Sequence, residues 1–147
     1  MPDYQQAKIY RIVNDSIPDK VYYGATTQSL VMRMASHRSS YKKNNRNCSS
    51  KPLFETGKAL IVLVENYPCN SKEELDKKER YYIENNDCVN KNIPLRTKAE
   101  YYVANRERIV NYKSQSITCE CGKTMQVNSL IRHKKTNLHK KKSALLL

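Results

Sequence analysis

An arginine, a histidine and a glutamate occupy the apolar faces of two predicted helices. Arg33 and His37 lie four residues apart on the first helix, and Glu79 lies between Leu75 and Ile83 on the second. Burying such groups near one another is costly unless they pair or serve a charged ligand. Together with tyrosines on two short strands upstream, they indicate chemistry on a phosphodiester.

Phosphodiester cleavage makes three demands that these side chains can meet. Charge accumulates on the phosphoryl oxygens, and the Arg33 guanidinium can stabilise it. A carboxylate such as Glu79 can hold Mg²⁺, a hard cation that prefers oxygen ligands. A general base must take a proton from water, and the candidates are Tyr10, Tyr22 and His37.

A tyrosine needs a nearby cation to act as a base, because its unperturbed pKa is about 10. Arg33, Lys8, Lys20 or the metal can provide that charge. Each residue also has a structural explanation: strand tyrosines are often core residues, and Arg33 can form a salt bridge with Glu79. The order and spacing of the whole set favour the catalytic interpretation.

The elements that must position these residues follow from the hydrophobic pattern. Residues 7–13 and 20–25 predict two strands joined by a polar turn, which implies an antiparallel hairpin. A helix follows, from an N-cap at Ser29 to about Tyr41. Residues 42–52 predict a polar loop that is either solvated or in contact with DNA.

A further strand and helix complete this domain. The continuous apolar run 59–64 predicts a strand buried on both faces, at the centre of the sheet. Ser71 opens a helix with a capping box, and the helix ends near Asn85. Residues 88–90 predict a last short strand. The fold class is α+β: over residues 5–95 we expect a three-stranded antiparallel sheet flanked by helices.

Five motifs in order make residues 7–94 similar to the GIY-YIG nuclease family. Lys8-Ile9-Tyr10 stands where the family has Gly-Ile-Tyr, and Tyr22-Tyr23-Gly24 stands where it has Tyr-Ile-Gly. The chain departs from the family at Lys8. Three further segments match. Arg33–His37 resembles the family's Arg-x-x-x-His helix, and Leu75–Ile83 resembles its Leu-x-x-x-Glu-x-x-x-Ile helix. Val89–Lys91 resembles its closing Asn motif.

This resemblance implies roles for single residues. It implies one metal ion, Mg²⁺ or Mn²⁺, bound by Glu79, with Arg33 at the scissile phosphate. Tyr10 and Tyr22 would take paired tyrosine roles, with Tyr10 as the general base, and Asn90 would support the site. The predicted catalytic set is Tyr10, Tyr22, Arg33, His37, Glu79 and Asn90.

Two smaller basic units follow the first domain. Residues 96–113 have apolar residues at helical spacing and many charges, which predicts a linker helix that either packs on the first domain or contacts DNA. Residues 114–147 contain two cysteines and two histidines, the ligand set of tetrahedral structural zinc. These predicted zinc ligands are Cys119, Cys121, His133 and His139.

Their spacing makes this module resemble a C₂H₂ zinc finger, with Met125 and Leu130 as its core pair and Gly122 in the tight turn of the C-x-C segment. The small size favours zinc over an unmetallated basic tail, because so few residues cannot bury a core alone. The residues predicted to contact nucleic acid are Arg106, Arg132, Lys134, Lys135, Lys140, Lys141 and Lys142.

Composition favours a polyanionic partner. The 147 residues include 27 lysines and arginines against 14 acidic residues, a net charge of +13, which favours DNA over a membrane surface and over a small-molecule substrate. No apolar run is long enough to span a bilayer, and no secretory signal is visible. Scattered cysteines fit reduced thiols. We therefore expect an intracellular protein, cytoplasmic or nuclear, or in the host cell if it is viral; the oligomeric state stays open.

The sequence thus predicts a metal-dependent DNA endonuclease of homing, mobile-element or viral type. One alternative is a structure-specific DNA repair nuclease. Another is a non-catalytic nucleic-acid-binding zinc-finger protein that uses the nuclease fold as a scaffold. The complete set of tyrosine, arginine, histidine and glutamate argues against the scaffold, while charge alone also permits an RNA-binding finger protein.

Overall fold

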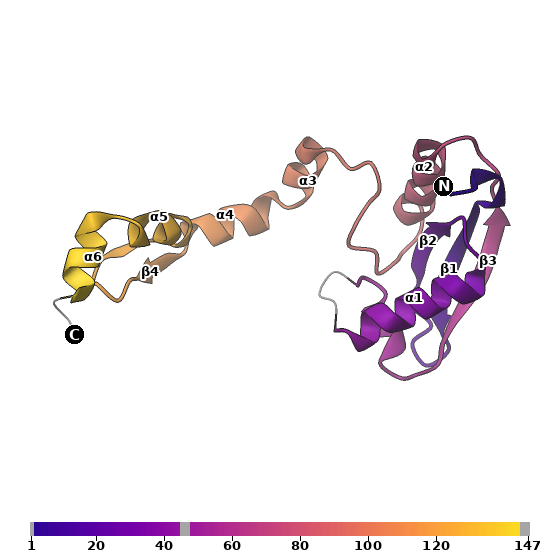
Figure 1. Cartoon of the computed structure of the whole chain (residues 1–147), viewed down its shortest axis with the longest axis horizontal. Helices are drawn as coiled ribbons and strands as arrows, with labels where there is room; N and C mark the ends of the chain where they lie inside the picture. Colours follow the sequence, from indigo (N-terminus) through magenta and orange to yellow (C-terminus); the bar gives the residue numbers. More distant parts are fainter. Residues whose placement is uncertain (1, 45–47, 145–147) are drawn as a thin grey trace. The chain divides into compact units, whose positions relative to one another are not determined.

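The computed structural model describes residues 2–44 and 48–144, the last three of these by their backbone only. The chain divides into two compact units, Met1–Leu95 and Arg96–Leu147 (Figure 1). Among the described residues, no helix combines the length and the apolar character needed to cross a membrane.

The first unit contains the predicted three-stranded antiparallel sheet. Its middle strand is β1 (Lys8–Asn14), with β2 (Tyr22–Thr26) on one side and β3 (Ala59–Asn66) on the other. Ile9 and Tyr10 point to opposite faces of the sheet and are both fully buried, as a central strand requires. The hairpin and the α+β class are therefore confirmed.

The prediction that the apolar run 59–64 forms the central strand is wrong. It begins β3, an edge strand on which Leu60 remains 54% exposed. The run is apolar throughout, yet only Ala59, Ile61 and Val64 of this strand pack on the core. A strand's position depends on the layers that cover it, and these layers leave much of β3 uncovered.

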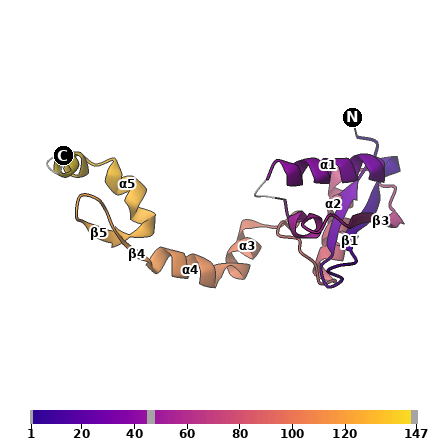
Figure 2. The same ribbon diagram turned by 90° about the horizontal axis from the view of Figure 1, so that it is seen from below.

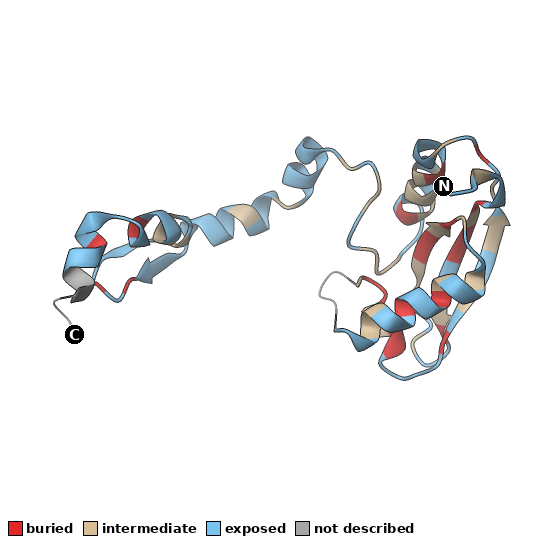
Figure 3. Ribbon diagram, viewed as in Figure 1, coloured by how far each residue is buried: buried red, intermediate tan, exposed pale blue. Residues whose placement is uncertain are grey.

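Two helices cover opposite faces of this sheet. α1 (Leu30–Lys42) crosses in front of the strands in Figure 1 and lies along one side of them in Figure 2. Together with η2 (Lys51–Phe54), it packs on the face that carries Tyr10. α2 (Lys72–Glu84) packs on the face that carries Ile9. The buried positions gather on the strands between these layers (Figure 3).

Both helices begin where the sequence predicts. The Ser29 hydroxyl accepts a hydrogen bond from the Met32 N–H at 3.3 Å, and the Ser71 hydroxyl accepts one from the Glu74 N–H at 3.2 Å. The Glu74 carboxylate accepts from the N–H of Asn70 rather than of the N-cap. The predicted capping box is therefore only half formed.

Residues 88–90 form no strand, although they lie alongside the free edge of β2 and bond to the β2 segment. The Val89 N–H donates to the Val21 carbonyl at 2.8 Å. The Asn90 side chain accepts from the Tyr23 N–H at 2.9 Å and donates to the Tyr23 carbonyl at 2.8 Å. One side-chain amide replaces two hydrogen bonds of a strand ladder, which is why the predicted strand is absent.

The second unit begins with two helices rather than the single helix predicted over residues 96–113. These are α3 (Lys98–Ala104) and α4 (Arg106–Ser114). Asn105 separates them, and its side chain donates to the Tyr101 carbonyl at 2.8 Å. Asparagine competes for backbone groups in this way, which makes it a frequent point of helix interruption.

The rest of the second unit is a ββα module. β4 (Ser116–Thr118) and β5 (Thr124–Gln126) form an antiparallel hairpin. After η3 (Val127–Ser129) come α5 (Leu130–Lys134) and α6 (Asn137–Ala144).

In the first unit, Gly24 is needed because Tyr10 lies against it. The two residues face each other in the β1–β2 register, and a Cβ on Gly24 would come within 2.4 Å of the Tyr10 hydroxyl oxygen. The ring has no freedom to move away, because it is fully buried and its hydroxyl is bonded to Arg33 and His37.

We expect Gly24→Ala to lower the free energy of unfolding by roughly 1–3 kcal/mol, because the methyl group overpacks a fixed ring. Urea denaturation measures the change. In a Tyr10→Ala background the same substitution should cost much less, because the obstacle is gone. Equal costs in both backgrounds would show that the strain arises elsewhere.

Candidate active site and candidate metal centre

An open cleft of about 470 Å³ in the first unit brings together most of the predicted catalytic set. The set members that line it are Tyr22, Arg33, His37, Glu79 and Asn90. They come from β2, α1, α2 and the segment after α2, so residues distant in sequence meet at one place. Tyr10 does not line the cleft; it lies behind it, fully buried.

The Tyr10 hydroxyl is the centre of a hydrogen-bond network behind the cleft. It accepts from Arg33 Nε at 2.8 Å and lies 2.8 Å from His37 Nε2. The Tyr22 ring packs beside the Tyr10 ring, with centroids 6.3 Å apart. The Tyr22 and His37 rings meet edge to face, with centroids 5.2 Å apart. The four side chains therefore form one connected group.

Burial raises the pKa of both Tyr10 and Tyr22, by more than the neighbouring Arg33 guanidinium lowers it. Of the cations proposed to activate a tyrosine, Arg33 is the one in contact, while Lys8 donates to the Gln28 carbonyl at 3.5 Å. Both tyrosines therefore keep their protons near neutral pH.

His37 is neutral over the same pH range. Burial, and secondarily the charge of Arg33, lowers its pKa to about 4. Its Nδ1 lies 2.9 Å from the hydroxyl oxygen of Ser50, a residue only 1% exposed. A neutral imidazole carries one donor and one acceptor nitrogen, so both nitrogens of His37 have a partner.

Glu79 lines the cleft near the free edge of β2, and the Ala25 backbone is one of the groups that lower the pKa of its carboxyl. Burial raises the pKa of this carboxyl to about 7, and repulsion from Asp76, one turn earlier on α2, adds to the effect. A divalent cation would relieve the repulsion and stabilise the ionised carboxylate. The donor chemistry therefore fits a hard cation such as Mg²⁺ or Mn²⁺ held by Glu79.

The polar residues of the cleft that were missed from the sequence include Ser50, Lys72 and Asp76, the last two joined in an ion pair. Asp76 could have been found, because it precedes Glu79 by three residues on one helix face. Ser50 gave no such signal, since it belongs to the predicted polar loop 42–52. The prediction that this loop is exposed to solvent is wrong near its C-terminal end, where Ser49 and Ser50 are buried.

Comparison with known families matches residues 6–92 to the GIY-YIG catalytic domain. The chain belongs to the GIY-YIG family. Searches of curated proteins and of solved structures gave no match. The matched span contains every residue of the predicted catalytic set, and a GIY-YIG domain indicates a nuclease that acts on DNA.

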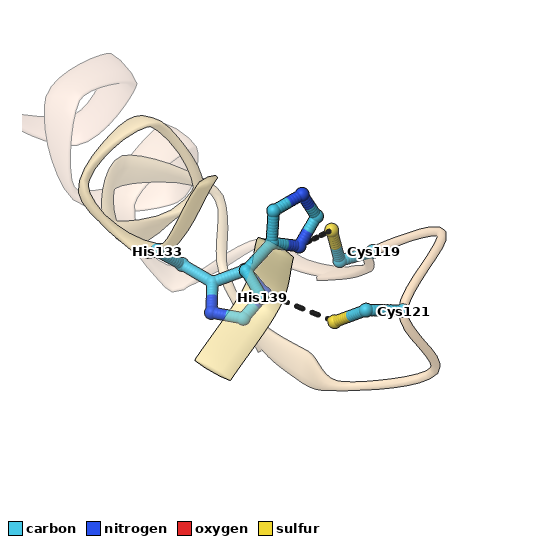
Figure 4. A group of neighbouring side chains, drawn as sticks. All are labelled: Cys119, Cys121, His133 and His139. Atoms are coloured by element: carbon cyan, nitrogen blue, oxygen red, sulfur yellow. Dashed lines mark hydrogen bonds between the residues drawn. The ribbon is translucent and has the colours of Figure 1, made fainter. Parts of the chain in front are cut away.

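Outside this GIY-YIG domain, the second unit holds a cluster that could bind a metal (Figure 4). Cys119 and Cys121 follow β4, while His133 and His139 lie on α5 and α6. Their ligand atoms all lie within 4.8 Å of one another, and all four residues are buried. Cys121 Sγ is 3.1 Å from His133 Nε2, and Cys119 Sγ is 3.6 Å from His139 Nδ1.

These separations suit zinc. Zinc bonds of about 2.0–2.3 Å in a tetrahedron place neighbouring ligand atoms roughly 3.3–3.8 Å apart, close to the two cysteine–histidine distances given above. Two thiolates and two imidazoles are also a preferred ligand set of that ion. The residues present therefore fit a structural zinc ion.

The backbone explains the unusual ligand spacing. Gly122 has a φ of +82°, a left-handed conformation suited to glycine, and its N–H donates to the Cys119 carbonyl at 2.8 Å. Thr136 separates the two helices: its hydroxyl donates to the His133 carbonyl at 2.8 Å and accepts from the His139 N–H at 3.2 Å. Each histidine thus has its own short helix.

The second unit also exposes the residues predicted to contact nucleic acid. Those with exposed side chains are Arg106, Arg132, Lys134, Lys135, Lys140 and Lys141. The side chain of Lys142 lies outside the described residues. Lys134 forms an ion pair with Glu120 at 3.3 Å. Residues 96–147 contain 12 lysines and arginines against three acidic residues, so this unit carries much of the positive charge.

We expect the neutral state of His37 to reduce stability in acid. Its pKa is about 6.5 when unfolded and about 4 when folded, so the unfolded chain binds more protons between these values. Stability should fall as the pH falls from 6.5 to 4, by roughly 3 kcal/mol. Urea denaturation at pH 7, 5.5 and 4 measures this.

The matched comparison is His37→Gln, which should lose this part of the pH dependence. Both proteins keep the two histidines of the metal cluster, so the contribution of that cluster cancels in the difference. The same pH dependence in wild type and His37→Gln would contradict the assignment.

We expect one zinc ion per chain in the purified protein, and we expect Cys119→Ser to lose it, because a hydroxyl is a poor ligand for this ion. Metal analysis of the full-length protein measures the ratio. Cys88→Ser is the matched control, since this thiol lies outside the cluster and contacts the Ile83 carbonyl. A wild-type chain that binds no zinc at micromolar concentration would favour a metal-free basic tail.

Proposed function

We propose that this GIY-YIG protein is a metal-dependent DNA endonuclease of mobile-element or viral type. The supporting observation is the convergence of a guanidinium, a carboxylate and a tyrosine–histidine network in one cleft. A structural salt bridge does not account for it. Arg33 and Glu79 both lie in the described part of the chain and form no ion pair there, since Arg33 bonds to Tyr10 instead.

Arg33 would bind the scissile phosphate. Its Nε is committed to Tyr10, which leaves the two terminal nitrogens for phosphate oxygens. Glu79 would hold Mg²⁺ or Mn²⁺, which when bound supplies positive charge for the phosphoryl and leaving oxygens. Asn90 would act indirectly, by fixing the edge of β2 beside Tyr22.

The attacking water would meet Tyr22, the tyrosine that lines the cleft. As Tyr22 takes a proton from water, its own proton would pass to Tyr10 and that of Tyr10 to His37 Nε2. This relay suits tyrosines whose pKa values are raised, because neither needs to exist as a phenolate. Tyr10, predicted as the general base, would act one step behind the water. A phosphate in the cleft would favour the imidazolium that forms.

The second unit would bind DNA. Its excess of lysines and arginines suits phosphate contacts, and its Cys/His cluster suits a zinc-stabilised module. Holding DNA through a separate module raises the local concentration of substrate at the catalytic domain. This division of labour supports the mobile-element or viral type over a structure-specific repair nuclease.

We expect Glu79→Gln to lower the rate of plasmid nicking roughly 100-fold or more, because the metal loses its carboxylate. DNA binding in a gel-shift assay should change little, since the basic second unit is intact. The matched control is Glu73→Gln, a carboxylate on the same helix that is exposed and pairs with Lys77. Near-normal nicking by Glu79→Gln would reject the metal assignment.

The same assay separates the remaining alternatives. Supercoiled plasmid and branched duplexes are offered side by side with Mg²⁺ or Mn²⁺. Strong preference for the branched duplexes would favour a repair nuclease. A protein that binds both substrates and cleaves neither would favour the scaffold interpretation.

A further inference from the structure

Ser50 contacts the catalytic set from a segment that the sequence analysis treated as a polar loop. It stands immediately before η2, is almost fully buried, and has its hydroxyl oxygen 2.9 Å from His37 Nδ1. The other nitrogen of the same ring lies against the Tyr10 hydroxyl. Ser50 is therefore the partner of His37 on the side away from the tyrosines.

Hydrogen-bond accounting fixes the direction of the contact between Tyr10 and His37. Arg33 has only donors, and its Nε donates to the Tyr10 oxygen. The hydrogen of this fully buried hydroxyl needs an acceptor, and His37 Nε2, 2.8 Å away, is its bonded partner that can accept, so the Tyr10 O–H points at His37.

The direction then continues to Ser50. Because Nε2 of the neutral ring accepts, Nδ1 carries the hydrogen and donates to the Ser50 oxygen. The Ser50 hydrogen is free to point at Cys48 Sγ, 3.4 Å away. Donors and acceptors therefore alternate in one direction from Tyr10 through His37 and Ser50 to Cys48.

We propose that Ser50 is a positioning residue of the nuclease site, which holds His37 in the tautomer whose Nε2 accepts the Tyr10 proton. In the other tautomer an N–H would point at Tyr10, and nothing there could take its proton. An oxygen that bonds one ring nitrogen of an imidazole fixes which of the two nitrogens carries the hydrogen. The catalytic consequence rests on the proposed function, whereas the tautomer itself does not.

The tautomer is measured by ¹⁵N NMR of the imidazole rings in the full-length zinc-loaded protein. The chain has three histidines, and His37→Gln identifies the signals of His37 by their loss. At pH 7 we expect wild-type His37 to carry its hydrogen on Nδ1. In Ser50→Ala the ring should shift toward the Nε2–H form. Wild-type His37 with its hydrogen on Nε2 would overturn the proposal.

The catalytic role is measured by plasmid cleavage with Mg²⁺. Ser50→Ala should lower kcat roughly 10-fold to 100-fold with little change in KM for DNA, because binding groups are untouched. Ser50→Thr keeps the hydroxyl and should restore both the tautomer and most of kcat. If its extra methyl prevents folding at this buried position, Ser50→Cys, with a weakly accepting thiol, should fall between serine and alanine in both measurements.

Ser39→Ala is the matched control, an exposed serine on α1 outside this network. Thermal unfolding of each variant identifies any loss of fold. A shifted tautomer with unchanged kcat, or an unshifted tautomer in Ser50→Ala, would overturn the proposal. If the wild-type protein cleaves no DNA, the proposed function fails, and the NMR result still decides whether Ser50 sets the tautomer.

Discussion

The buried hydroxyl of Tyr10 is the point on which both the fold and the candidate site depend. A phenol oxygen without access to water must find its hydrogen bonds within the protein, or its burial becomes costly. Arg33 and His37 supply them, and thereby join the central strand to α1. Gly24 leaves the space in which the ring lies. The same contacts that satisfy a buried polar group thus orient two cationic or titratable side chains beside the cleft.

The second constraint is the unpaired edge of β2, whose backbone groups need partners. Residues of the candidate site lie along this edge. An edge strand exposes N–H and C=O groups that invite pairing with another chain. Asn90 covers both groups of Tyr23, and the Ala25 backbone lowers the pKa of the nearby Glu79 carboxyl. A fourth strand here would fill the place where these two polar side chains reach the cleft. Incomplete pairing of the sheet is therefore part of how the site is built.

Local signals predicted the parts of this structure that local interactions determine. The hairpin and the N-caps at Ser29 and Ser71 form as expected, and so does the cluster of two cysteines and two histidines. The edge position of β3 was not predictable, because an apolar run does not tell which layers will cover it. Nor was Ser50, whose role depends on where a polar loop ends beneath α1. The errors occur where long-range packing decides the outcome.

The two units differ in what their buried residues are. The GIY-YIG domain buries Ile9, Tyr10 and Ile12 between helices, so apolar contacts can stabilise it without a metal. In the described part of residues 96–147, the only buried side chains are the two cysteines and two histidines of the cluster. Such polar ligands gain little by burial unless a cation binds them, so metal binding to this cluster would be coupled to the folding of the unit. A protein built this way would keep its proposed catalytic centre on a self-supporting scaffold and make its proposed DNA-binding surface conditional on the metal.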